Sequence, residues 1–207
     1  MNDHSFIIRG GRMIMKKDRP KYKQIIDAAV IVIAENGYHQ AQVSKIAKQA
    51  GVADGTIYLY FKNKEDILIS MFQDKLGSFI SNIEEEMERV SSAKEKMLVL
   101  VRKHFEILSE DKHLAIVTQL ELRQSNKEIR YKINDVLKGY LKLVDSILIA
   151  GIEKGEFQKD LDVRLARHMV FGTLDEIVTT WVMNEQKYNL NKQAEPVHHL
   201  IIKGLGA

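Results

Sequence analysis

Apolar side chains recur every three or four residues over most of this chain, which is the spacing of one face of an α-helix. This spacing predicts a first helix from Lys21 to Asn36. Gly37 follows directly, and a glycine at this position often adopts the left-handed conformation that ends a helix. The apolar positions of this helix are Ile25, Ile26, Ala29, Val30, Ile33 and Ala34.

A second, shorter helix is predicted across QVSKIAKQA, and Gly51 ends it. Val52 and Ala53 complete a three-residue turn with that glycine, and Asp54 is expected to cap a third helix, GTIYLYF. Two helices joined by a short turn that contains glycine form a helix-turn-helix.

The rest of the chain is also predicted to be helical, beginning with a long amphipathic helix from Lys64 to Val90. No segment alternates with the period of two that a strand requires, so the sequence predicts an all-α fold without strands. The further predicted helices are Ala93–Ser109, His113–Gln124, Asn126–Lys154, Asp162–Asn184 and Glu195–Leu205.

Composition restricts the function classes. The chain has no cysteine, which excludes disulfides and thiolate chemistry, and its longest apolar run, Ala28–Ala34, is too short to cross a bilayer. A cytoplasmic protein is therefore expected. The net charge is +3, but residues 1–66 carry 11 Lys and Arg against 7 Asp and Glu, so the basic excess lies in the first third. This asymmetry favours a polyanion-binding module.

Residues 1–18 show no periodicity and are predicted to be a disordered basic arm. Met13 or Met15 is an alternative start, followed by the basic stretch MKKDRPKY. On that interpretation residues 1–14 are not native to the protein.

The segment that follows the turn carries side chains suited to a DNA backbone. Gly55 and Thr56 are small enough for a close approach, and the hydroxyls of Tyr58 and Tyr60 have the reach for phosphate oxygens. Phe61 is expected to anchor inward. The predicted DNA-binding residues are Gln42, Ser44, Lys45, Asp54, Gly55, Thr56, Tyr58, Tyr60, Phe61 and Lys64.

These residues carry a family resemblance. The stretches IAKQAGV from Ile46 and GTIYLYFKNKEDIL from Gly55 resemble the DNA-binding signature of the TetR family of repressors. Gln42 departs from that pattern, because such proteins commonly place a capping threonine there. The resemblance implies a helix-turn-helix head at residues 19–66 and a helical body at residues 67–207 that binds a small ligand and forms a homodimer on double-stranded operator DNA.

The body also resembles a narrower group, the FadR-type repressors of bacterial fatty-acid degradation, in AIVTQLELRQSN and DVRLARHMVFGTLDE. This resemblance implies a long-chain acyl-CoA effector that releases the protein from DNA. The expected ligand residues combine apolar side chains, which could equally be ordinary core, with basic ones: Phe79, Ile83, Met87, Met97, Arg102, Phe105, Leu120, Arg123, Arg130, Tyr140, Met169 and Trp181.

The helix Asp162–Asn184 is apolar around nearly its full circumference, so it is expected to be buried on two sides. One side would face the body and the other a second copy of the chain; a central core helix is the alternative. The predicted dimer residues are Met169, Gly172, Thr173, Ile177, Leu200 and Ile201.

Other function classes remain as alternatives or are disfavoured. The sequence has no nucleophile elbow, P-loop, zinc-binding His-Glu-x-x-His or dinucleotide fingerprint, so no catalytic residue, metal site or cofactor is predicted. A repressor of drug efflux would share the head but use a different pocket. Glu121 is the candidate partner for a cationic compound there, although it could equally pair with an arginine of the protein. A scaffold with a vestigial helix-turn-helix is a further alternative.

Overall fold

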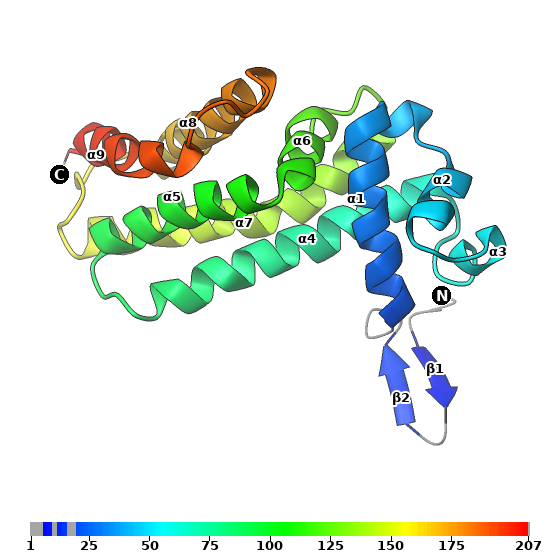
Figure 1. Ribbon diagram of the computed structural model, residues 1–207. Coiled ribbons are helices and arrows are strands. Elements are labelled where there is room, and N and C mark those ends of the chain that lie inside the picture. Colours follow the sequence, from blue (N-terminus) through cyan, green and yellow to red (C-terminus); the bar gives the residue numbers. More distant parts are fainter. Residues whose placement is uncertain (1–5, 10–11, 16–19, 207) are drawn as a thin grey trace. The chain divides into compact units, whose positions relative to one another are not determined.

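The computed structural model describes residues 6–9, 12–15 and 20–206, and these residues are almost entirely helical (Figure 1). The all-α fold class is confirmed. The helices are α1 (Pro20–Gln40), α2 (Val43–Gln49), α3 (Asp54–Ile57), α4 (Lys64–Met87), α5 (Ala93–Glu110), α6 (Lys112–Glu121), α7 (Lys127–Glu153), α8 (Val163–Met183), the 3-10 helix η2 (Leu190–Gln193) and α9 (Ala194–Gly204).

The expectation that the chain has no strands is wrong. Strands β1 (Phe6–Arg9) and β2 (Arg12–Met15) pair antiparallel, with Phe6 opposite Met15 and Arg9 opposite Arg12. The missed signal is Gly10–Gly11 between two apolar stretches, a typical hairpin sequence. The rest of the predicted arm, residues 1–5, 10–11 and 16–18, lies outside the described residues.

The chain forms two compact units, Met1–Asp74 and Lys75–Ala207, so the division falls within α4 rather than before it. The first turns of α4 belong to the first unit because they carry Ile67, Leu68 and Met71, all fully buried. The predicted boundary at residue 66 marks the end of the helix-turn-helix sequence and not the end of this packing.

The first unit is a small helical core built around α1. The predicted break at Gly37 is confirmed, since this residue has φ of 71° and ψ of 154° and interrupts the helix. Stacking of Tyr22 on Phe61, with ring centroids 5.2 Å apart, ties the start of α1 to the segment after α3. Ile46 and Ile57 are fully buried and hold α2 and α3 on the same core.

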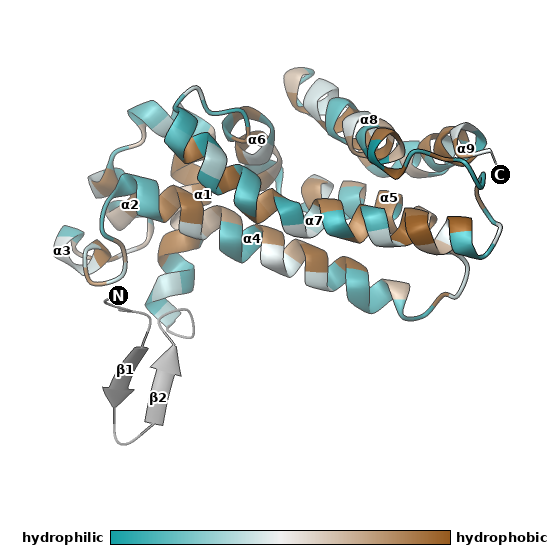
Figure 2. Cartoon of the chain, turned by 180° about the vertical axis from the view of Figure 1, so that it is seen from behind, coloured by the Kyte–Doolittle hydropathy of each residue, from teal (hydrophilic) through white to brown (hydrophobic). Residues whose placement is uncertain are grey.

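The second unit is a bundle in which α5 packs against α7 and α9, and α8 packs against α6 and α7. Hydrophilic and hydrophobic residues both occur along the whole length of α4, α5 and α7 (Figure 2), as expected for helices with one buried face. Side chains cap several of these helices: Ser92 and Glu95 form a reciprocal capping box at α5, and Asn126 and Asp162 accept from the first turns of α7 and α8. None of the helices in the described part of the chain is long and apolar enough to span a membrane.

Gly151 supports this bundle because α7 and the segment after it approach closely there. A Cβ at residue 151 would overlap the ring of Phe157, which is itself buried. We expect Gly151→Ala to lower the free energy of unfolding by about 1–3 kcal/mol through overpacking. Urea unfolding measures this loss as a lower midpoint. Gly77→Ala is the matched control, because a Cβ at residue 77 would meet nothing within 4 Å. This substitution should leave the free energy of unfolding unchanged or raise it by up to about 1 kcal/mol. An equal loss of stability in both variants would contradict the packing argument.

Candidate DNA-binding surface and effector-binding core

The turn between α2 and α3 forms as predicted. Gly51 has φ of 63°, which a side chain would disfavour, and Val52 N–H donates to the carbonyl of Ala47 at 3.0 Å. Gln42 precedes α2 and its side chain makes no capping hydrogen bond, as its poor capping ability suggests.

The third helix differs from the prediction in both its start and its length. Ala53 occupies the N-cap position and Asp54 is the first helical residue, so Asp54 does not cap the helix. The helix ends at Ile57, and residues 58–60 form a turn in which Tyr60 N–H donates to the carbonyl of Ile57. The sequence GTIYLYF is therefore one helical turn followed by a turn of different geometry.

This geometry separates the two tyrosines. Tyr58 is 60% exposed, whereas Tyr60 is only 7% exposed and its ring lies 6.4 Å from that of Phe61. The expectation that both tyrosines face solvent is wrong for Tyr60, and the inward placement of Phe61 agrees with the structure. Leu59, which the sequence analysis did not single out, is 72% exposed beside Tyr58. Of the other predicted DNA-binding residues, Thr56 is half-buried and the exposed ones are Gln42, Ser44, Lys45 and Gly55, together with Asp54.

Lys64 has an internal role that the sequence did not indicate. Its Nζ donates to the carbonyls of Tyr38 at 2.9 Å and His39 at 3.0 Å, and it lies 4.7 Å from the centre of the Tyr38 ring. These contacts tie the start of α4 to the end of α1. Two of the three ammonium protons are thus used within the protein, and phosphate contact by the third stays a prediction.

We expect Tyr58→Phe to weaken operator binding about 5- to 10-fold, because one phosphate hydrogen bond is worth roughly 1 kcal/mol. Fluorescence anisotropy with a labelled duplex measures the change. Tyr131→Phe removes the hydroxyl of another exposed tyrosine, in the second unit, and should leave the affinity unchanged. Equal effects of the two substitutions would contradict the placement of Tyr58 on the DNA-binding surface.

In the second unit the predicted effector residues fall into two groups. The buried ones are Phe79, Ile83, Met87, Met97, Phe105, Tyr140 and Trp181. The residues at least partly open to solvent are Arg102, Leu120, Arg123, Arg130 and Met169. Most of the apolar predicted residues thus lie in the interior of the bundle, whereas Leu120, Met169 and the three arginines lie at its surface.

Four helices contribute to an aromatic cluster in this interior, which we define as Phe79, His104, Phe105, Tyr140 and Phe171. Phe79 meets His104 edge-on at 5.4 Å and Tyr140 at 5.7 Å between ring centres. Phe105 and Phe171 complete the cluster, at 5.9 Å from His104 and 6.1 Å from Tyr140 respectively. Such a cluster provides an apolar, aromatic environment for a hydrocarbon chain.

His104 and Tyr140 form the polar centre of the aromatic cluster. Nδ1 of His104 lies 2.8 Å from the hydroxyl of Tyr140. Burial lowers the pKa of His104 to about 3, and burial, with a smaller contribution from the charge of Asp175, raises the pKa of Tyr140. Both side chains are therefore neutral throughout the physiological range.

The three predicted arginines are all engaged within the protein. Arg102 pairs with Glu195, and Arg123 pairs with Asp175, whose carboxylate is buried. Arg130 donates to the carbonyl of Gln124 at 2.9 Å. The side chain of Arg123 is more than half exposed, so its ion pair joins the surface to a buried carboxylate.

Glu121 and Trp181 also make structural contacts. Glu121 is buried and accepts a hydrogen bond from Gln124, an arrangement that already satisfies part of its carboxylate. Trp181 donates from Nε1 to the carbonyl of Tyr188 at 2.8 Å and so fixes the segment after α8. The structure places Trp181 outside the aromatic cluster.

The predicted dimer residues lie mainly on one open face of α8 and α9. Met169 and Leu200 are exposed, as is Gly172, while Thr173 and Ile177 are half-buried. Ile201 is only 2% exposed and packs inside the bundle, so its assignment to the dimer surface is corrected. The exposed residues that sequence analysis missed on this face are Leu165 and Met183.

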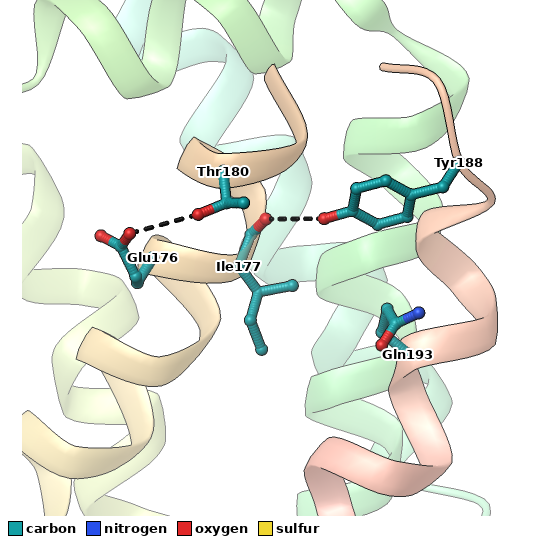
Figure 3. A pocket seen from close by; sticks show the side chains of 5 residues that line it. All are labelled: Glu176, Ile177, Thr180, Tyr188 and Gln193. Carbon is teal, nitrogen blue, oxygen red and sulfur yellow. Dashed lines mark hydrogen bonds between the residues drawn. The ribbon is translucent and has the colours of Figure 1, made fainter. Parts of the chain in front are cut away.

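A shallow pocket of about 330 Å³ opens beside this face, lined by Glu176, Ile177, Thr180, Tyr188 and Gln193 (Figure 3). The Tyr188 hydroxyl donates to the carbonyl of Ile177 at 3.5 Å, and Thr180 donates to Glu176 at 3.2 Å. None of the predicted effector residues lines this pocket, which separates it from the aromatic cluster.

Comparison with known proteins assigns both units of the chain to described protein families. Residues 25–71 match the model of bacterial regulatory proteins of the tetR family, and residues 72–204 match that of the YsiA-like protein C-terminal region. The chain belongs to the TetR family. The helix-turn-helix, α2 and α3, lies within the segment that matches the family's N-terminal, DNA-binding region.

Individual relatives narrow the group. The chain is 65% identical, over 191 residues, to the fatty acid metabolism regulator protein of Bacillus subtilis. The matched region covers 92% of this chain and 98% of that protein. The structure is similar to that of the fatty acid degradation regulator FadR from Bacillus halodurans, with 63% identity, a TM-score of 0.87 and coverage of 89% and 99% of the two chains. It is also similar to Bacillus subtilis FadR in complex with stearoyl-CoA, with 65% identity, a TM-score of 0.86 and coverage of 88% and 98%.

Proposed function

We propose that this TetR-family protein is a cytoplasmic, dimeric repressor of fatty-acid degradation genes that leaves its operator when it binds long-chain acyl-CoA. The observation that carries the proposal is 65% identity, over nearly the full length of both chains, to a FadR whose structure contains stearoyl-CoA. The exposed face around Tyr58 and the aromatic cluster of the second unit support the two halves of this activity independently.

On the DNA side, the segment from Asp54 to Tyr58 enters the major groove, which is about 12 Å wide. Tyr58 contacts a phosphate, and the exposed Leu59 lies where an apolar side chain can contact the duplex. Because one short reading segment discriminates weakly, two copies act together on half-sites about 34–36 Å apart. Such paired engagement reaches affinities on the order of 10⁻⁸–10⁻¹¹ M.

The dimer forms through the open face of α8 and α9. Exposed positions Leu165, Met169, Gly172 and Met183 follow helical spacing along α8. A Cβ on Gly204 of α9 would lie 3.1 Å from the sulfur of Met169, so the two helices pack closely and their exposed residues form one surface. Leu200, one turn before Gly204, extends it, and a partner that covers this surface removes these apolar side chains from water.

On the effector side, the acyl tail packs among the aromatic cluster and the neighbouring apolar side chains. Burial at about 0.8 kcal/mol per methylene yields a gross gain near 10 kcal/mol for a long chain, which leaves micromolar affinity after ordering costs. Arg123 at the surface is a candidate partner for the phosphates of CoA. To bind them, its guanidinium group gives up part of its ion pair with Asp175.

Release from DNA follows if the effector prefers a conformation in which the two heads cannot reach both half-sites. A coupling of about 1–3 kcal/mol reduces DNA affinity 5- to 150-fold. Helix α4 is the natural connection, since it begins with Lys64 in the first unit and carries Phe79 and Ile83 into the second.

A gel-shift assay on the DNA upstream of the protein's own gene, with and without palmitoyl-CoA, tests the proposal. We expect a shifted protein–DNA complex that dissociates when palmitoyl-CoA is added at micromolar concentration. The absence of any complex with operator-containing DNA would contradict the repressor assignment. A complex that is insensitive to palmitoyl-CoA would favour the drug-efflux alternative and remove acyl-CoA as the effector.

A further inference from the structure

His104 carries a hydrogen-bonding capacity that the fold does not use. The side chain is only 6% exposed, and its Nε2 has no hydrogen-bond partner among the residues that the structure describes. Buried polar groups are nearly always paired, and one left without a protein partner in a native structure often has a functional reason. The position of this nitrogen inside the aromatic cluster indicates what that reason is.

The pairing of His104 with Tyr140 leaves a free donor in either tautomer. If the Tyr140 hydroxyl donates to Nδ1, the ring proton is on Nε2 and that N–H is unused. If Nδ1–H donates to the Tyr140 oxygen instead, the hydroxyl proton of Tyr140 is unused. The pair therefore offers one hydrogen-bond donor to a third group in both cases.

The environment of the His104–Tyr140 pair favours a neutral hydrogen-bond acceptor over a charged one. Phe79, Phe105 and Phe171 provide hydrocarbon rings around the pair. Besides burial, which has the larger effect, the charge of Asp175 raises the pKa of Tyr140, and this acid is already paired with Arg123. A carboxylate placed beside the pair would lose its hydration without gaining a counter-charge, whereas a neutral carbonyl loses much less.

We propose that His104 and Tyr140 donate a hydrogen bond to the carbonyl oxygen of the acyl thioester and thereby select acyl-CoA over free fatty acid. The proposal rests on the proposed function, since it assigns a contact to that effector. The thioester oxygen is the acceptor attached directly to the hydrocarbon chain, so it arrives among apolar rings together with the tail. The donor and the apolar cluster then recognise the two adjoining parts of one ligand.

Isothermal titration of the full-length protein with three probes tests this assignment. The probes are palmitoyl-CoA, S-hexadecyl-CoA, which is a thioether without the carbonyl oxygen, and palmitate. We expect the thioether to bind about 5- to 10-fold more weakly than palmitoyl-CoA, the effect of one hydrogen bond, and palmitate to bind more weakly still. Equal affinities for the two CoA compounds would overturn the proposal and leave the proposed function intact. Failure of both to bind would overturn the proposed function itself.

Variants locate the contact. His104→Phe keeps a ring in the cluster and should bring palmitoyl-CoA down to the affinity of the thioether, with the thioether unchanged. His198→Phe is the matched control, because His198 contacts a backbone carbonyl of α5 outside the cluster, and it should keep the preference of the wild-type protein. Retention of the full preference by a folded His104→Phe protein would overturn the assignment. If that variant does not fold, the wild-type comparison of thioester with thioether decides alone.

Discussion

Leu200→Glu should abolish operator binding at concentrations where the wild-type protein is saturated, a loss of at least about 100-fold. Leu200 is 66% exposed on α9, beside the exposed apolar residues of α8. In the dimer proposed above, a carboxylate at this position would be covered by the second copy without a partner of opposite charge, which costs several kcal/mol. Since a single head binds DNA weakly, loss of the dimer removes most of the affinity.

Analytical ultracentrifugation and fluorescence anisotropy measure the two consequences together. The variant should sediment as a folded monomer with an unchanged circular dichroism spectrum. Ile149→Glu introduces the same charge at an exposed apolar position of α7 and should leave both the dimer and the DNA affinity intact. A Leu200→Glu protein that stays dimeric would show that copies associate through another surface.

Phe79→Trp should keep operator affinity within about twofold and raise the palmitoyl-CoA concentration needed for release at least 10-fold. Phe79 is buried and contacts both His104 and Tyr140, so a larger ring would fill space that the acyl chain needs in the proposed site. The DNA-binding surface lies in the other unit and keeps its own residues.

Anisotropy titration of the preformed protein–DNA complex with palmitoyl-CoA gives the half-effective concentration. Phe157→Trp adds the same volume to a buried position outside the aromatic cluster. It should lower stability without a selective change in the effector response. An unchanged response in Phe79→Trp would argue against the aromatic cluster as the site of the acyl chain.

Helical periodicity predicted most helices of both units to within a few residues, because packing of one apolar face largely determines these helices. It missed the 3-10 helix η2 and made α3 too long. The β1–β2 pairing was missed because its apolar residues do not alternate with polar ones. The placement of Tyr60 was missed for a different reason. The helix α3 ends after one turn, so helical spacing no longer describes which way residues 58–61 point.

Burial on a helix surface was only partly predictable. Leu200 and Ile201 are consecutive apolar residues about 100° apart on α9, and only the bundle decides which of them is inside. The engagement of Lys64 with two carbonyls and of Arg123 with Asp175 depends on residues distant in the sequence. Likewise, the sequence does not show that His104 and Tyr140, which are 36 residues apart, lie within hydrogen-bond distance of each other.

The central claim is that the segment from Asp54 to Tyr58 lies against a duplex, together with its twin in the second copy, and that acyl-CoA ends this engagement. Hydroxyl-radical footprinting of the upstream DNA tests it most directly. The account predicts two protected patches on one face of the duplex, about one helical turn apart, that disappear together when palmitoyl-CoA is added. A single patch, or two patches that persist at saturating palmitoyl-CoA, would contradict it.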